Sequence, residues 1–76
     1  MTQQTAGVTH TPNPQYDLIS VLYHALEGGQ TCDVYVKDAE QAGDRELAQF
    51  FRQVQQEQTT CADKAKQLLA RRVQVQ

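Results

Sequence analysis

The chain has 76 residues, which is enough for one small domain at most. Seven basic and nine acidic residues give a net charge of −2, and both signs are scattered along the sequence. This argues against a nucleic-acid partner, which would need a basic stripe. No stretch approaches the roughly 20 consecutive apolar residues of a membrane span, and residues 1–14 lack the apolar core of a secretion signal. We therefore expect a cytoplasmic protein outside the membrane, with Cys32 and Cys61 as thiols.

The N-terminal segment, residues 1–12, is rich in Thr and Gln and has no apolar period. Such a composition cannot offset the entropy lost on ordering, so we expect a flexible tail. Asn13 and Pro14 then predict the start of a helix, because Asn caps helix N-termini and Pro suits the first helical position. Asp17 adds a negative charge to the first turn, which favours the same start.

Residues 14–42 carry small or apolar side chains at alternating steps of four and three, which predicts an amphipathic helix with a wide buried stripe. The stripe consists of Leu18, Leu22, Ala25, Gly29, Cys32, Val36 and Ala39. A second stripe of Ile19, Leu22, Tyr23 and Leu26 widens it in the first half. Gly28 and Gly29 lie in mid-helix, where each costs about 1 kcal/mol relative to Ala. Either a neighbouring helix approaches closely there or the helix is locally kinked, or else the helix breaks and three shorter helices result.

Gly43 and Asp44 predict a turn, because Gly fits the left-handed position that ends a helix and Asp caps the next one. A second helix is expected over residues 45–72, followed by a short C-terminal end at 74–76. Its apolar residues are Leu47, Phe50, Phe51, Val54, Cys61, Ala62, Ala65, Leu68 and Leu69. The short turn makes the two helices antiparallel, so the expected fold is an all-α two-helix hairpin over residues 13–73.

The two apolar stripes are too wide for the helices to cover each other. A second hairpin would close a four-helix bundle, so we expect a homodimer, with a different protein as the other route. Counted from Gly43, the levels of Cys32 and Cys61 along the hairpin differ by roughly 10 Å, at 1.5 Å per residue. That offset exceeds the reach of a disulfide bond within one chain.

Four residues form the candidate metal site. His24 and Glu27 are three residues apart on the first helix, and Glu57 and Cys61 are four apart on the second. Counted from Gly43 they share a level, so two copies of the chain would bring carboxylates and imidazoles together near the bundle centre. The competing interpretation is structural: Glu57 lies in a Gln-rich run typical of a solvated face, and His24 lies beside apolar residues. Neither Ser20 nor the cysteines have an Asp-His pair to activate them, which argues against nucleophilic catalysis.

The segments Glu27 to Tyr35, Glu46 to Phe51 and Glu57 to Ala62, together with Ala39, carry a family resemblance. Over about residues 15–71 the chain resembles one helical hairpin of the ferritin-like superfamily, including its rubrerythrin-type and encapsulated-ferritin-type members. The resemblance implies a metal-binding Glu on the first helix, which Glu27 matches, and Glu-x-x-His on the second. Glu57 matches that Glu, but Thr60 occupies the His position; shifting the frame by one gives Cys61 at the His position and Gln58 at the Glu position.

The resemblance implies a small half-ferritin that dimerises around a di-iron centre. Because the motif is incomplete, we favour an interpretation in which the assembly is kept and the metal centre is lost or altered. The leading hypothesis is a self-associating structural or protein-interaction module without enzymatic activity. The alternative is a protein that binds iron, manganese or zinc through Glu27, Glu57, His24 and Cys61, in which the cysteine favours zinc.

Overall fold

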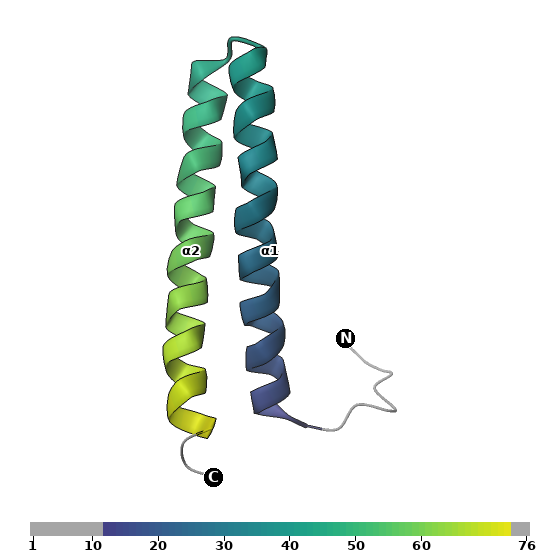
Figure 1. Ribbon diagram of the computed structural model, residues 1–76, viewed down its shortest axis with the longest axis vertical. Helices are drawn as coiled ribbons and strands as arrows, with labels where there is room; N and C mark the ends of the chain where they lie inside the picture. The colour runs from purple at the N-terminus through teal and green to yellow at the C-terminus, as the bar shows by residue number, and fades with distance from the viewer. Residues whose placement is uncertain (1–11, 74–76) are drawn as a thin grey trace.

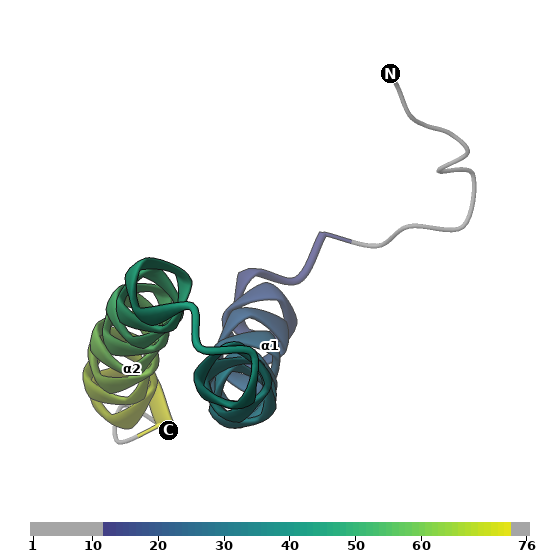
Figure 2. The same ribbon diagram turned by 90° about the horizontal axis from the view of Figure 1, so that it is seen from above.

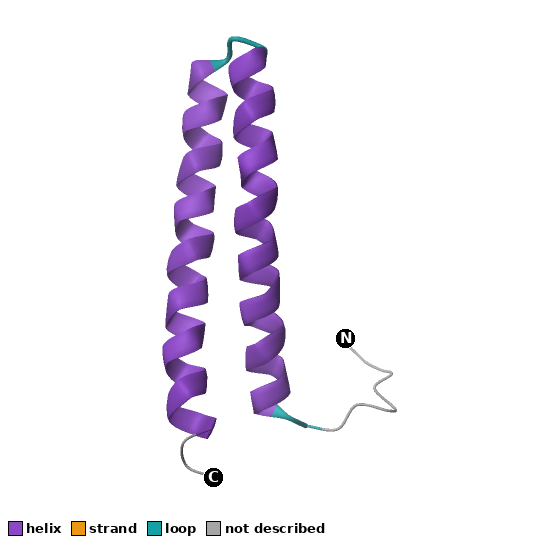
Figure 3. Cartoon of the chain, in the orientation of Figure 1, coloured by secondary structure: helices purple, strands orange, loops and turns teal. Residues whose placement is uncertain are grey.

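The computed structural model describes residues 12–73, so the expected tail up to Thr11 and the end at 74–76 lie outside the described residues. Helix α1 comprises Pro14–Gln41 and helix α2 comprises Arg45–Val73. The two helices run antiparallel and lie side by side (Figures 1 and 2). Within the described range all regular structure is helical (Figure 3). The predicted all-α hairpin is confirmed.

The start of α1 is fixed by its cap. The side-chain oxygen of Asn13 accepts a hydrogen bond from the Tyr16 N–H at 3.0 Å, and its carbonyl oxygen accepts one from the Asp17 N–H at 3.0 Å. Pro14 occupies the first helical position, where its missing N–H has no consequence. The cap therefore pairs N–H groups that the helix itself leaves without acceptors.

The turn at 42–44 reverses the chain through a left-handed glycine. Gly43 has φ +75°, and its N–H donates to the Glu40 carbonyl at 3.0 Å. The Asp44 N–H donates to the Ala39 carbonyl at 2.9 Å, which completes the Schellman pattern at the end of α1. Asp44 then caps α2, because its Oδ1 accepts a hydrogen bond from the Leu47 N–H at 3.0 Å.

The contact between the helices is built from small side chains. The buried hydrophobic residues are Ala25, Cys32, Val36, Ala39, Ala48, Ala62 and Ala65. Five of these seven are alanines, and within residues 12–73 none of the buried side chains is larger than valine. The helices therefore approach closely but bury little apolar surface against each other.

The glycine pair lies inside α1, which continues from Pro14 to Gln41, so the alternative of a broken helix is wrong. A Cβ atom at Gly28 would lie 3.1 Å from Cδ and Nε2 of Gln58, which is tighter than ordinary contact. A Cβ atom at Gly29 would lie 4.0 Å from Cβ of Gln58, an ordinary distance. Close approach by α2, through Gln58 at Gly28, is the observed reason for one glycine of the pair.

Both cysteines are free thiols, Cys32 buried and Cys61 exposed, as the offset along the hairpin axis predicted. The turn at Gly43 and Asp44 therefore brings the helices together without a disulfide bond between them. Neither helix in the described part of the chain combines the length and apolar character that a membrane crossing needs.

The glycine pair gives a matched test of helix packing. We expect Gly29→Ala to raise the free energy of unfolding by about 0.5–1 kcal/mol, because alanine has the higher helix propensity and meets only ordinary contacts. Gly28→Ala should raise the free energy of unfolding by less, because the Gln58 side chain must move aside. Chemical denaturation at equal protein concentration measures both. Gln58→Ala should restore the full gain to Gly28→Ala, and equal gains for the two single variants would contradict this packing.

Candidate functional site

Large apolar side chains remain at the surface of the hairpin. The exposed ones among the described residues are Tyr16, Ile19, Val21, Tyr23, Leu26, Val34, Tyr35, Leu47, Phe50 and Val73. Phe50 is 54% exposed and Ile19 is 48% exposed, whereas the alanines between the helices are at most 4% exposed. Surface apolar groups that gather in patches mark interaction sites, so their arrangement on the two helices decides what the surface can bind.

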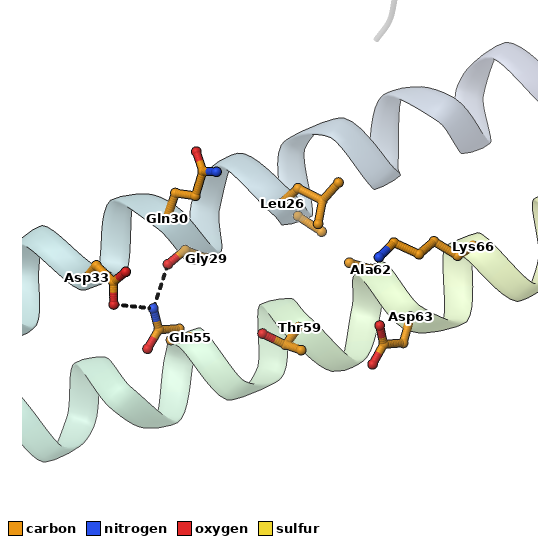
Figure 4. A pocket seen from close by; sticks show the side chains of 10 residues that line it. Leu26, Gly29, Gln30, Asp33, Gln55, Thr59, Ala62, Asp63 and Lys66 are labelled. Carbon is orange, nitrogen blue, oxygen red and sulfur yellow. Dashed lines mark hydrogen bonds between the residues drawn. The ribbon is translucent and has the colours of Figure 1, made fainter.

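One patch lies on the first half of α1 and consists of Tyr16, Ile19, Tyr23 and Leu26. These residues follow each other at steps of three, four and three, so they share one side of the helix. Leu26 also borders a groove of about 370 Å³ between the helices, and α2 contributes Thr59, Asp63 and Lys66 to it (Figure 4). The α1 patch is therefore apolar next to a polar strip of α2.

Gln55 links the helices across this groove. Its Nε2 donates to the carbonyl oxygen of Gly29 at 2.8 Å and to Oδ1 of Asp33 at 2.9 Å (Figure 4). The hydrogen bond to the Gly29 carbonyl is partly buried, whereas the bond to Asp33 is exposed to water. Close by toward the turn, Arg52 and Glu40 form an exposed ion pair between the helices. These polar contacts fix how α2 sits against α1.

A second patch, called here the α2 face, consists of Leu47, Phe50, Val54, Cys61 and Leu68. The residues follow each other at steps of three, four, seven and seven, so they share one side of α2. Leu47, Phe50 and Cys61 are exposed, and Val54 and Leu68 are half-buried. The α2 face thus runs along most of the helix.

Aromatic rings join the α2 face to α1 near the turn. The Phe51 ring lies 5.5 Å from the Tyr35 ring and 5.9 Å from the Phe50 ring, measured between centroids. Leu47 and the rings of Tyr35 and Phe51 border a groove of about 360 Å³, which also takes in Asp38 and Ala42. Apolar side chains therefore gather at the turn end of the hairpin.

The α1 patch and the α2 face lie on opposite sides of the contact between the helices. Asp33 lines the groove beside the α1 patch, and Tyr35 lines the groove beside the α2 face. Asp33 and Tyr35 are two positions apart in α1, which rotates their side chains by about 200° around the helix axis. The two grooves therefore open on different sides of the hairpin. The contact between the helices therefore separates the α1 patch from the α2 face.

The predicted metal ligands lie at the surface: His24, Glu27, Glu57 and Cys61 are all exposed. His24 Nδ1 donates to the Ser20 carbonyl oxygen at 2.9 Å, and its ring meets that of Tyr23 edge-on at 5.3 Å. Across residues 12–73, no group of three or more His, Cys, Asp or Glu side chains is placed to hold a metal ion. A single hairpin does not gather these four residues into a site, and the two-copy site stays a prediction.

The sequence interpretation overlooked Ala48 and Gln55. Ala48 is only 2% exposed, and Gln55 makes the hydrogen bonds between the helices. The sequence does contain a pattern that predicts their position. Ala48, Gln55 and Ala62 follow each other at steps of seven, so they lie on one side of the helix. Gln55 was hidden by its position in a run of glutamines that suggests a solvated face.

Known proteins offer no direct guide to these surfaces. Comparison of the chain with protein-family models, with curated proteins and with solved structures finds no match. The function therefore has to be inferred from the α1 patch, the α2 face and the side chains around them.

The link made by Gln55 can be tested against its neighbour. We expect Gln55→Ala to lower the free energy of unfolding by about 1 kcal/mol, because a partly buried hydrogen bond to Gly29 and an exposed one to Asp33 are lost. Gln56→Ala is the matched control, since Gln56 is exposed and adjacent in sequence. Urea denaturation followed by circular dichroism measures the difference. Equal stabilities of the two variants would contradict a stabilising role for Gln55.

Proposed function

We propose that this chain is a self-associating helical hairpin that forms a homodimeric four-helix bundle and acts as a structural or protein-interaction module. The observation that carries the proposal is the inverted distribution of apolar side chains. Alanines fill the contact between the helices, while Phe50, Leu47 and Ile19 are exposed. A helix pair with its largest apolar groups outside has its main binding surface outside as well.

The free energy of burying apolar side chains supports dimer formation. Burying a Leu, Ile or Phe side chain stabilises by about 1.5–3 kcal/mol, whereas the alanine contacts contribute much less. Domains of this size bury only about 60% of the surface of their unfolded chains, so their own cores are marginal. A second copy that covers the α2 face would supply the missing burial, and the α1 patch on the opposite side would stay available to another protein.

The polar surroundings of the two patches suit a binding role. Charged and amide side chains such as Asp33, Asp63 and Lys66 border the apolar groups at the groove beside the α1 patch. An apolar centre with a polar rim is the usual arrangement of a protein-protein interface. We place the protein in the cytosol, where its free cysteines would stay reduced.

Self-association is tested by sedimentation equilibrium over a range of protein concentrations. We expect a monomer–dimer equilibrium, and Phe50→Glu should raise the dimer dissociation constant at least tenfold. The reason is that each dimer loses two buried rings, each contributing about 1.5–3 kcal/mol, and gains two charges at the interface. Because Phe50 is 54% exposed, the hairpin itself should keep its fold.

Gln49→Glu is the matched control, because it adds the same charge at the adjacent exposed position, away from the α2 face. Its dissociation constant should stay close to that of the natural chain. A natural chain that remains monomeric at all accessible concentrations would overturn the proposal. Equal weakening by both variants would show a general charge effect rather than an apolar interface.

Metal binding is the second candidate, and the orientation of His24 favours it. Donation from Nδ1 to the Ser20 carbonyl leaves Nε2 as the ligand nitrogen, an arrangement common among metal-bound histidines. The ferritin-like resemblance adds Glu27 and Glu57 as carboxylate ligands. Two copies would be needed, because one hairpin does not bring enough ligands together.

This candidate has its own measurement. Dialysis against iron, manganese or zinc followed by elemental analysis should find near-stoichiometric metal per dimer if the site exists. The double variant Glu27→Gln, Glu57→Gln should lose that metal, because both charged ligands are removed. Glu46→Gln serves as the control, since Glu46 lies at the other end of α2. A metal-free dimer in all dialyses would exclude this candidate while leaving self-association intact.

A further inference from the structure

The α2 face has a spacing that suits pairing with a second α2. Four of its residues, Leu47, Val54, Cys61 and Leu68, follow each other at steps of seven. The same series is read from either end of the helix. A second α2 running in the opposite direction therefore presents its side chains at matching levels, as in antiparallel coiled coils. This symmetry fits a second copy of the chain better than an unrelated helix.

Charge favours the same direction. Asp44 and Glu46 flank Arg45 at the start of α2, which leaves a net charge of −1 there, and Arg71 and Arg72 lie in its last turn. Antiparallel pairing places the acidic start of one α2 beside the basic end of the other, and the helix dipoles also oppose. Parallel pairing would bring like charges together at both ends. A second copy in the antiparallel direction is therefore the occupant that the charges fit.

Overlap of the apolar side chains selects the register. Heptad spacing permits registers that differ by seven residues, but only one of them overlaps the whole α2 face. In that register Leu47 lies level with Leu68 of the partner subunit, and Val54 with the partner's Cys61. Phe50 lies level with the partner's Ala65, which is buried against α1, so the ring flanks the seam. A shift by one heptad would leave a large apolar side chain without an apolar counterpart at each end.

We infer that the α2 face binds the α2 face of a second copy, antiparallel and in this register, with the twofold axis beside Glu57 and Gln58. The inference rests on the proposed self-association and adds its interface and direction. It also places the two Glu57 carboxylates next to each other at the axis. Gln58 packs on Gly28 instead, so it lies on the flank toward α1.

The two cysteines at position 61 test the proposed arrangement. In the antiparallel register they are seven residues apart along the axis, or about 10 Å, which is too far for a disulfide bond. Position 54 of one copy, however, lies level with Cys61 of the other. In a parallel pair, Cys61 would lie beside the partner's Cys61 and link directly.

The experiment is mild oxidation of Val54→Cys, followed by non-reducing electrophoresis and peptide mapping of the covalent dimer. We expect a disulfide between positions 54 and 61 of the two copies, formed at least tenfold faster than any covalent dimer of the natural chain. Gln56→Cys is the matched control, because position 56 is exposed on the opposite side of α2. It should cross-link no faster than the natural chain.

Each contrary result points to a different failure. Rapid linkage of Cys61 to Cys61 in the natural chain would overturn the proposed arrangement, because it fits a parallel pair or an antiparallel pair shifted by one heptad. A Val54→Cys protein that sediments as a dimer but does not link positions 54 and 61 would overturn the register and leave self-association standing. A natural chain that sediments as a monomer would overturn both.

A charge variant tests the position of the twofold axis independently, without a new cysteine. Glu57→Gln should tighten the dimer about twofold, because two adjacent like charges are removed at the axis. Asp63→Asn is the control, since Asp63 borders the groove beside the α1 patch instead. Its dissociation constant should not change. A weaker dimer for Glu57→Gln would contradict the position of the axis.

Discussion

The alanine contacts between the two helices determine which apolar side chains are buried and which are exposed. Small side chains at Ala25, Ala39, Ala48 and Ala62 let α1 and α2 pack closely, and the hydrogen bonds from Gln55 hold them in place. Close packing of small groups fixes geometry but buries little apolar area, and stability scales with that area. The larger apolar side chains are left on the outside, where they either meet water or meet another chain.

The larger apolar side chains form two exposed surfaces that differ in length. The α2 face follows nearly the whole length of α2, whereas the α1 patch is confined to the first half of α1. A long, self-complementary seam suits a permanent pairing of identical copies, and a short apolar patch beside polar groups suits a separate partner. In this account the homodimer completes the fold, and the opposite side remains free for the protein-interaction role. Both roles follow from where Leu, Ile, Phe and Tyr stand relative to the alanines.

Local signals made the fold predictable, and long-range packing made the site less so. Asn13, Gly43 and Asp44 specify where the helices begin and end through their own backbone and side-chain hydrogen bonds, so sequence is sufficient there. Periodicity also predicts which residues face inward, but it does not say how far two apolar stripes overlap. For that reason Phe50 was assigned to an apolar stripe without its exposure being foreseen, and Gln55 was assigned to a solvated face. The proposed metal site depends on a second chain, which one sequence cannot place.

The most direct measurement of the central claim is the thermal unfolding midpoint as a function of protein concentration. If the exposed apolar side chains are buried by a second copy, unfolding is coupled to dissociation, and the midpoint rises steadily with concentration. Calorimetry over a hundredfold concentration range would follow this dependence, with Phe50→Glu measured alongside. The account predicts a clear rise for the natural chain and a lower midpoint for the variant. A midpoint that stays constant across the whole range would mean that the hairpin folds alone, and it would contradict the account.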